Sequence, residues 1–126
     1  MVVTLACVGA GNWGRNLVRV FAGLPDVRLK TICDASQDIR SGMGSQYLGT
    51  HVESDYSAVL ADVEIEAVVL AVPAMHHFET ARQALEAGKH VYVEKPIALS
   101  YDHAKQLTEL AEGRGLVLMV GHLMEY

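Results

Sequence analysis

The stretch Gly9-Ala10-Gly11-Asn12-Trp13-Gly14, which directly follows the apolar run Val2–Val8, decides the fold. Three glycines in a G-x-G-x-x-G arrangement are typical of a loop that leaves a β-strand and enters a helix. Gly9 permits the tight turn, Gly11 leaves the backbone open to a pyrophosphate, and Gly14 lets the helix pack closely on the sheet. The glycine spacing alone is weak evidence, because it often marks a turn without a ligand.

The residues after the loop supply the context that strengthens it. Trp13, Leu17, Phe21 and Leu24 recur at helical spacing and predict a helix that begins at the loop. The diphosphate of a dinucleotide would then meet the free N–H groups at the start of that helix. On this basis we predict that Gly9, Gly11, Asn12, Trp13 and Gly14 contact a bound cofactor.

An acidic residue lies where a dinucleotide site requires one. Asp34 comes twenty residues after Gly14, at the end of the apolar run Val27–Cys33. Its carboxylate is placed to accept hydrogen bonds from the adenosine ribose and to repel a 2′-phosphate, which favours NAD over NADP. Two alternatives stay open: Asp34 only caps the next helix, or Arg40 turns back to bind a phosphate and NADP is accepted.

Short apolar runs and segments of helical periodicity alternate along the whole chain. A first helix after the glycine loop and a weaker one from Ser36 to about Gln46 are expected. Ser54 is the expected cap of a short helix that runs through Leu60. Two later helices carry the apolar stripes Phe78, Ala81, Leu85 (closed by Gly88) and Leu107, Leu110, Ala111 (capped by Ser100). The predicted strands are Val2–Val8, Val27–Cys33, Thr50–Glu53, Ala67–Val72, His90–Val93 and Leu116–Gly121.

Strands that alternate with helices imply parallel pairing, since each parallel connection needs a crossover. Right-handed crossovers place helices on both faces of the sheet. The sequence therefore predicts an α/β fold with a doubly wound parallel sheet of about six strands in the order 3-2-1-4-5-6. A length of 126 residues fits one such domain, spanning residues 1–126.

Composition and charge exclude several other classes of protein. The net charge of −5 argues against nucleic acid or an anionic membrane as a partner. Cys7 and Cys33 lie in predicted strands and are expected to be reduced core thiols. No Cys/His spacing predicts a metal site, and the N-terminus lacks the pattern of a secretion signal. We therefore expect a cytoplasmic protein.

A second motif, Glu94-Lys95-Pro96, follows the strand at His90–Val93. Ligands bind at the carboxyl ends of strands in open α/β sheets. Pro96 keeps Lys95 out of the helical conformation and so presents it on an extended backbone. A lysine beside a substrate hydroxyl can donate a hydrogen bond and lower the pKa of that hydroxyl. The alternative is a solvated Glu–Lys pair that contributes little.

With these motifs in place, the chain resembles the N-terminal domain of the Gfo/Idh/MocA oxidoreductases, the relatives of glucose–fructose oxidoreductase and inositol dehydrogenase. The resemblance covers essentially the whole chain. Its carriers are the glycine loop, Cys33-Asp34, Ala71-Val72-Pro73 followed by His77, Ala84–His90, and Glu94-Lys95-Pro96.

The resemblance implies that Lys95 is the catalytic residue between nicotinamide and substrate, and that Glu94, Val72, Pro73 and His77 contact the cofactor. Val72 and Ala74 replace residues that are commonly polar in the family, which puts polar contacts there in doubt. The adjacent His76-His77 pair does not predict a metal site, because neighbouring residues at a helix start point in different directions.

The resemblance also implies a reaction: hydride transfer between a sugar hydroxyl and nicotinamide. Gly14–Arg19 and Gly121–Tyr126 resemble the branch with nucleotide-sugar dehydrogenases, which points to a sugar or nucleotide-sugar substrate. Relatives carry a second α+β domain with the catalytic histidine. We expect that this domain is missing here, that the chain alone is inactive, and that the exposed docking surface favours a homo-oligomer.

Two other functions remain open from the residues alone. A stand-alone NAD(P)-binding or sensor module would share the fold without catalysis, and only an enzyme would need Lys95. A methyltransferase-like or CoA-binding Rossmann domain is the other possible function, and the Glu94-Lys95-Pro96 motif argues against it.

Overall fold

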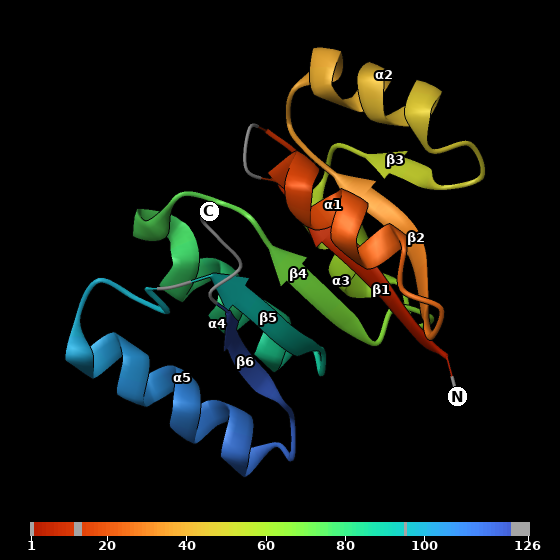
Figure 1. Ribbon diagram of the computed structural model, residues 1–126. Helices are drawn as coiled ribbons and strands as arrows, with labels where there is room; N and C mark the ends of the chain where they lie inside the picture. Colours follow the sequence, from red (N-terminus) through yellow and green to blue (C-terminus); the bar gives the residue numbers. More distant parts are fainter. Residues whose placement is uncertain (1, 12–13, 95, 122–126) are drawn as a thin grey trace.

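A computed structural model describes residues 2–11, 14–94 and 96–121 of the chain (Figure 1). Strands and helices alternate from one end to the other. The strands are β1 (Val3–Val8), β2 (Val27–Cys33), β3 (His51–Glu53), β4 (Ala67–Leu70), β5 (His90–Glu94) and β6 (Leu118–Gly121). The helices are α1 (Gly14–Ala22), α2 (Gln37–Gln46), α3 (Tyr56–Ala61), the 3-10 turn η1 (Ala74–His76), α4 (His77–Glu86) and α5 (Tyr101–Gly113).

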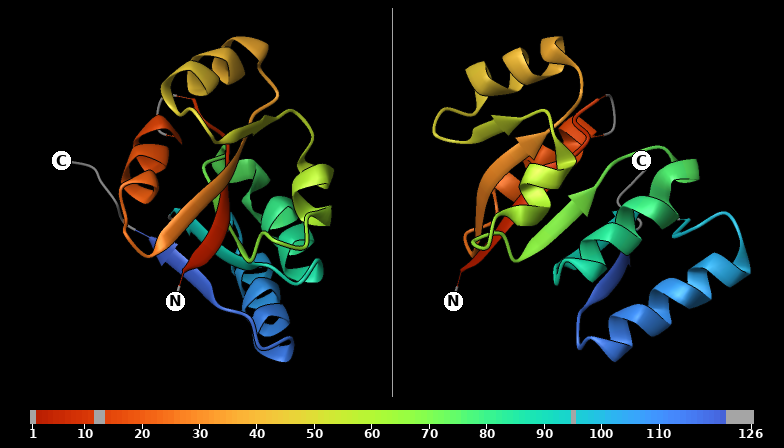
Figure 2. Two further views of the ribbon diagram at one scale, coloured as in Figure 1. Left: turned by 90° about the vertical axis from the view of Figure 1, so that its right-hand side faces the viewer. Right: turned by 180° about the vertical axis from the view of Figure 1, so that it is seen from behind.

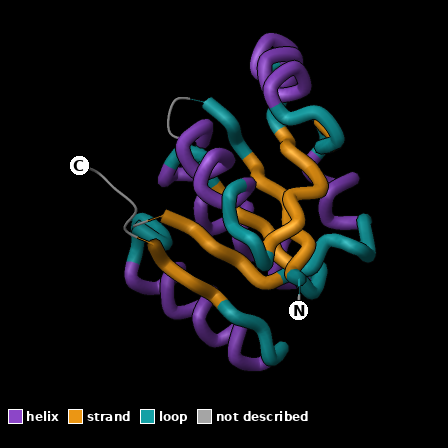
Figure 3. The backbone as a smooth tube through the Cα atoms, turned by 45° about the vertical axis from the view of Figure 1, so that its right-hand side comes forward, coloured by secondary structure: helices purple, strands orange, loops and turns teal. Residues whose placement is uncertain are grey.

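The strands form one parallel sheet in the order β3-β2-β1-β4-β5-β6, which confirms the predicted fold class and strand order. The order reverses between β1 and β4, because the chain crosses from one edge of the sheet to the middle after β3. The sheet runs through the centre of the molecule with helices on both sides (Figure 3). A crevice at such a reversal is where ligands bind in doubly wound sheets.

Alternate residues of the central strands pack into two apolar layers. On one face, Leu5 and Cys7 of β1 pack with Leu17 and Val18 of α1 and with Met43 of α2. On the other face, residues of the central strands pack with the buried side chains of three helices: Val59 of α3; Ala81, Ala84 and Leu85 of α4; Leu107 and Ala111 of α5. The left view of Figure 2 shows α1 on one side of the sheet and α3, α4 and α5 on the other. Strands covered on both faces explain why the apolar runs were nearly continuous.

Several predicted boundaries are wrong by one or two residues, each for a local reason. β4 ends at Leu70 instead of Val72, since the chain turns away toward Pro73, which has no N–H to donate to a neighbouring strand. β6 starts at Leu118 instead of Leu116, whose N–H bonds the Ala111 carbonyl in the turn that ends α5. β5 extends to Glu94, which pairs with Gly121.

Helix α1 ends earlier than the apolar stripe predicts. Gly23 and Leu24 donate to the carbonyls three residues before them, which closes a tight turn after Ala22. Leu24 is consequently exposed and does not belong to the helix.

Of the two serine caps predicted from the sequence, Ser100 is confirmed and Ser54 is wrong, while Ser36, the expected first residue of its helix, is instead the N-cap. Ser36 and Ser100 accept hydrogen bonds from Ile39 and His103, as N-cap side chains do. Gly88 follows α4 with a φ of +83°, the left-handed conformation expected after a helix C-terminus. Ser54 is not a cap: Asp55 accepts from the N–H of Ser57 and starts α3 instead.

Both cysteines are buried free thiols, as the sequence predicts. Burial raises the pKa of Cys7 to about 12 and that of Cys33 to about 11. Neither side chain is therefore a reactive thiolate at neutral pH. Among the described residues, no helix has the length and apolarity needed to cross a membrane.

Candidate functional site

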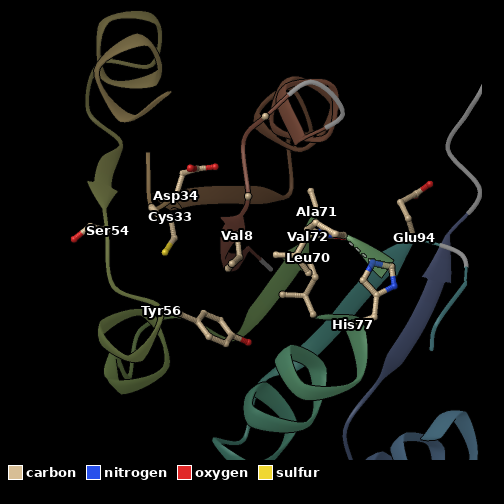
Figure 4. A pocket seen from close by; sticks show the side chains of 14 residues that line it. Val8, Cys33, Asp34, Ser54, Tyr56, Leu70, Ala71, Val72, His77 and Glu94 are labelled. Carbon is tan, nitrogen blue, oxygen red and sulfur yellow. Dashed lines mark hydrogen bonds between the residues drawn. The ribbon is translucent and has the colours of Figure 1, made fainter. Parts of the chain in front are cut away.

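A cleft of about 610 Å³ opens at the carboxyl ends of the central strands (Figure 4). This volume lies within the usual range of ligand sites. The cleft is lined by the loop after β1, the end of β2, the segment after β4 and the end of β5. Asp34 and Glu94 stand on opposite sides of it, and Val72 lies between them (Figure 4).

Two of the three glycines are required by backbone packing. Gly9 has a φ of +92°, and a Cβ there would lie 2.7 Å from the carbonyl oxygen of Ala71. A Cβ on Gly14 would overlap the carbonyl oxygen of Gly9 and lie 3.3 Å from the Cβ of Ala71. These contacts bring β1, α1 and the end of β4 together without side chains between them. The cleft wall at this point is therefore bare backbone.

Gly11 differs from its two neighbours. No described atom lies within 4 Å of a Cβ placed on Gly11, although the residue lines the cleft. The Gly11 carbonyl accepts from the N–H of Arg15, so it belongs to the start of α1. The first turn of α1 contains no acidic side chain. Open space beside an uncompensated helix N-terminus suits a diphosphate.

Asp34 joins the glycine loop to β2. Its Oδ2 accepts from the N–H of Ala10 at 2.8 Å, and its Oδ1 accepts from the N–H of Ser36 at 2.9 Å. Because Ser36 is the N-cap of α2, the alternative that Asp34 caps this helix is wrong. A carboxylate has about four acceptor positions, so two backbone bonds still allow ribose hydroxyls to bind.

Arg40 lies beside the same carboxylate. Its Nη1 donates to the carbonyl oxygens of Asp34 at 2.9 Å and Ala35 at 3.0 Å. The guanidinium is thus held next to the end of β2 by backbone carbonyls. This position is compatible with a 2′-phosphate as well as with a plain ribose, because a guanidinium has further donors to offer.

The segment after β4 and the segment after β5 are tied together by His77. The ring is buried, with Nε2 2.9 Å from the carbonyl oxygen of Val72 and Nδ1 2.5 Å from that of Pro96. A neutral imidazole can donate to only one of these carbonyls, and a doubly protonated ring can donate to both. His77 is the first residue of α4, which has no side-chain cap bond. Val72, Pro73 and His77 all line the cleft.

The structure leaves three predicted site residues untested. Asn12, Trp13 and Lys95 lie outside the described residues. Glu94, which precedes Lys95, lines the cleft and accepts a hydrogen bond from the hydroxyl of Tyr92 at 2.8 Å.

Ala35, Ser54 and Tyr56 also line the cleft, and sequence reasoning did not place them in the site. The Tyr56 hydroxyl donates to the carbonyl of Thr80 at 2.7 Å, which joins α3 to α4 beneath the cleft. Burial raises the pKa of Tyr56 above its ordinary value, so the phenol stays protonated. The signal in the sequence was that Tyr56 follows the short loop after β3. In a parallel sheet, the carboxyl end of β3 lies at the same edge as those of the other strands.

A glycine turn into a helix N-terminus, an acid at the tip of β2 and a cleft at the strand-order reversal together define a dinucleotide-binding Rossmann domain. Residues 3–122 match the model of the oxidoreductase family with an NAD-binding Rossmann fold, the Gfo/Idh/MocA family, and the chain belongs to it.

Relatives extend this assignment. The chain is 31% identical to 2,7-anhydro-N-acetylneuraminate hydratase of Mediterraneibacter gnavus, over 98% of this chain and 32% of the relative. The solved structure of GenD2 from gentamicin A biosynthesis, in complex with NAD, has a TM-score of 0.90 and 35% identity and covers 95% of this chain and 34% of its own.

A second solved structure is KijD10 of Actinomadura kijaniata, a 3-ketoreductase in complex with TDP-benzene and NADP. It has a TM-score of 0.88 and 27% identity and covers 95% of this chain and 38% of its own. The chain thus spans about a third of the length of these relatives. One neighbour holds NAD and the other NADP, so both cofactors occur on this fold.

Proposed function

We propose that this domain binds NAD(H) in the cleft and forms the cofactor half of an oxidoreductase that transfers a hydride between a sugar hydroxyl and nicotinamide. One observation carries the proposal: the glycine loop, with its exposed backbone at Gly9 and Gly11, is fixed to Asp34 through the N–H of Ala10. Diphosphate and ribose sites are thereby held in one rigid unit.

The orientation of the cofactor follows from the two carboxylates. Asp34 and its neighbours Ser54 and Tyr56 mark the adenosine side, since the acid after β2 is the ribose partner in this fold. The nicotinamide then extends across Val72 and Pro73 toward Glu94 and Lys95. The apolar walls of Val8, Leu70, Ala71 and Val72 suit the rings of a dinucleotide.

NAD is proposed over NADP because the Asp34 carboxylate repels a 2′-phosphate. Arg40 offers the opposite charge beside it, so the preference is expected to be modest in size. The direct measurement is calorimetric titration of the chain with NADH and NADPH. Tighter binding of NADPH would contradict the preference, and binding of neither would contradict the function.

The substrate is proposed to be a sugar or nucleotide-sugar, with Lys95 donating a hydrogen bond to the reacting hydroxyl. Support comes from the family assignment and from relatives named for a sugar-acid hydratase and a ketoreductase bound to a nucleotide analogue. When bound, the nicotinamide supplies the hydride acceptor. Glu94 lines the end of the cleft where the substrate would approach, and His77, which also lines the cleft, contacts the carbonyl oxygen of Pro96.

Residues 1–126 alone are proposed to bind cofactor without turnover, since the relatives are about three times as long. The test is NADH formation at 340 nm from NAD and a panel of UDP- and TDP-sugars. Turnover by residues 1–126 would contradict the proposal that they are inactive on their own. The alternative of a sensor module is tested by introducing Lys95→Ala into a longer chain that includes these residues. The change should abolish turnover if the protein is an enzyme. It should leave cofactor binding unchanged if the protein is a sensor.

We further propose a cytoplasmic homo-oligomer that binds neither nucleic acid nor membrane. Support for self-association comes from the edge strand β6 and the residue before it, where Val117, Met119 and Val120 are exposed. Light scattering after gel filtration checks this, and a monomer at all concentrations would contradict it.

A further inference from the structure

Tyr92 and Glu94 lie two residues apart on β5 and therefore on the same face of the sheet. Between them, Val93 points to the opposite face and is buried in the layer that includes α4 and α5. Tyr92 packs with the layer that includes α1. The hydroxyl of Tyr92 donates to Oε2 of Glu94 at 2.8 Å. The phenol thus connects the packed face of the sheet to a carboxylate that lines the cleft.

The ring of Tyr92 is fixed by two neighbours. Phe21 of α1 meets it edge to face, with ring centroids 5.3 Å apart and an interplanar angle of 69°. This arrangement is favourable for aromatic pairs. Phe21 belongs to α1, so the phenol is held by the helix that follows the glycine loop.

The second neighbour is Gly121 at the end of β6. A Cβ on Gly121 would overlap the hydroxyl and the ring of Tyr92. The phenol therefore occupies the space that a side chain at position 121 would fill. Gly121 also pairs with Glu94 in the sheet.

Burial, and next the hydrogen bond with Glu94, raises the pKa of the Tyr92 phenol above its ordinary value. The hydroxyl consequently remains a donor throughout the neutral range. A donor on a held ring restricts the rotation of the carboxylate that accepts its hydrogen bond.

We propose that Tyr92 is a positioning residue that holds the Glu94 carboxylate for the ribose hydroxyls on the nicotinamide side of the cofactor. The inference rests on the proposed function, since it assigns a role at the same cleft. It adds a residue that does not line the cleft and acts only through Glu94.

The test measures binding of NADH and ADP by calorimetry to the wild-type chain, Tyr92→Phe, Glu94→Gln and the double variant. ADP carries the adenosine and both phosphates but lacks the nicotinamide ribose. Tyr92→Phe is expected to weaken NADH binding roughly three- to tenfold and to leave ADP binding within about twofold. In the Glu94→Gln background, the same change is expected to have a smaller effect, less than about twofold, because the neutral amide oxygen accepts a weaker hydrogen bond from the phenol than the carboxylate does.

Tyr47→Phe is the matched control, since it removes the same atom from a partly buried phenol that does not line the cleft. NADH binding by wild type with no loss in Tyr92→Phe would overturn the positioning role alone. Equal losses for NADH and ADP, or an undiminished loss in the Glu94→Gln background, would also overturn it, because a merely structural role acts without Glu94. Failure of the wild-type chain to bind NADH at all would instead overturn the proposed function on which the inference rests.

Discussion

Exchanging Gly11 and Gly14 for alanine, one at a time, separates the cofactor-binding role of the loop from its structural role. A methyl group on Gly11 meets no described atom within 4 Å, so it changes only the open side of the cleft. A methyl group on Gly14 overlaps the Gly9 carbonyl oxygen and lies 2.7 Å from its carbon. The same chemical change should therefore act on binding at one position and on folding at the other.

The structure sets the size of each effect. Carbon atoms pack at about 3.5 Å or more, so the Gly14 methyl requires backbone movement of about 0.8 Å. Overpacking of this kind costs about 3 kcal/mol, the upper part of the usual range. For a domain of this size, that lowers Tm by about 12 °C, at roughly 4 °C per kcal/mol. Gly11→Ala should change stability by no more than about 0.5 kcal/mol, or about 2 °C.

Thermal unfolding followed by circular dichroism measures the change in Tm, and calorimetric titration with NADH measures the change in binding affinity. Gly11→Ala is expected to keep its Tm and to weaken NADH binding at least about tenfold, because the methyl group occupies the approach of the diphosphate. If Gly11→Ala binds NADH like wild type, the diphosphate does not contact this backbone. If the Tm of Gly11→Ala falls as far as that of Gly14→Ala, the description of Gly11 as bordering open space is wrong.

Three further predictions follow from the hydrogen bonds and charges. Asp34→Ala leaves the N–H of Ala10 without its acceptor and removes the charge that repels a 2′-phosphate, so titration should show NADH affinity falling more than NADPH affinity; an unchanged ratio would mean that Asp34 only anchors the loop. His77→Leu should lower the free energy of unfolding in urea by about 1–3 kcal/mol, because the carbonyls of Val72 and Pro96 lose their polar contacts with the buried ring, whereas His76→Leu at the exposed neighbour should cost little; equal effects would refute a structural role for the two contacts of His77. The hydrogen bonds of Lys30 hold the pKa of the Asp62 and Glu64 carboxyls below their ordinary values, so this stabilisation is complete above about pH 5 and is lost as the pH falls through the lowered pKa values. Between pH 6 and pH 3, Tm should therefore fall less in Lys30→Met than in wild type. Parallel curves of Tm against pH would show that the ion pairs of Lys30 with Asp62 and Glu64 contribute nothing to stability.

The sequence was sufficient for the fold class and strand order because two periodicities and one glycine motif agreed. The nearly continuous apolar run at Val3–Val8 predicts a strand covered on both faces, which the two helix layers confirm. Boundaries were less predictable. Leu24 fits the apolar stripe of α1, but the turn at Gly23 ends the helix before it.

Hydrogen bonds between distant residues could not be predicted from spacing. Asp34 was expected at the ribose site, yet nothing in the sequence indicates that it also accepts from Ala10, 24 residues away. His77 was expected near the cofactor, and its contact with Pro96, 19 residues on, depends on how the loops after β4 and β5 meet. Such contacts depend on which residues of neighbouring strands lie side by side. The residue pattern predicts the order of the strands but not this register.

The most direct test of the account is titration of the chain with NADH while the emission of Trp13 is followed. Trp13 is the only tryptophan and belongs to the glycine loop. The account predicts saturable quenching, with energy transfer to the reduced nicotinamide. No saturable change up to millimolar NADH or NADPH, together with no heat of binding, would contradict a dinucleotide site at the glycine loop.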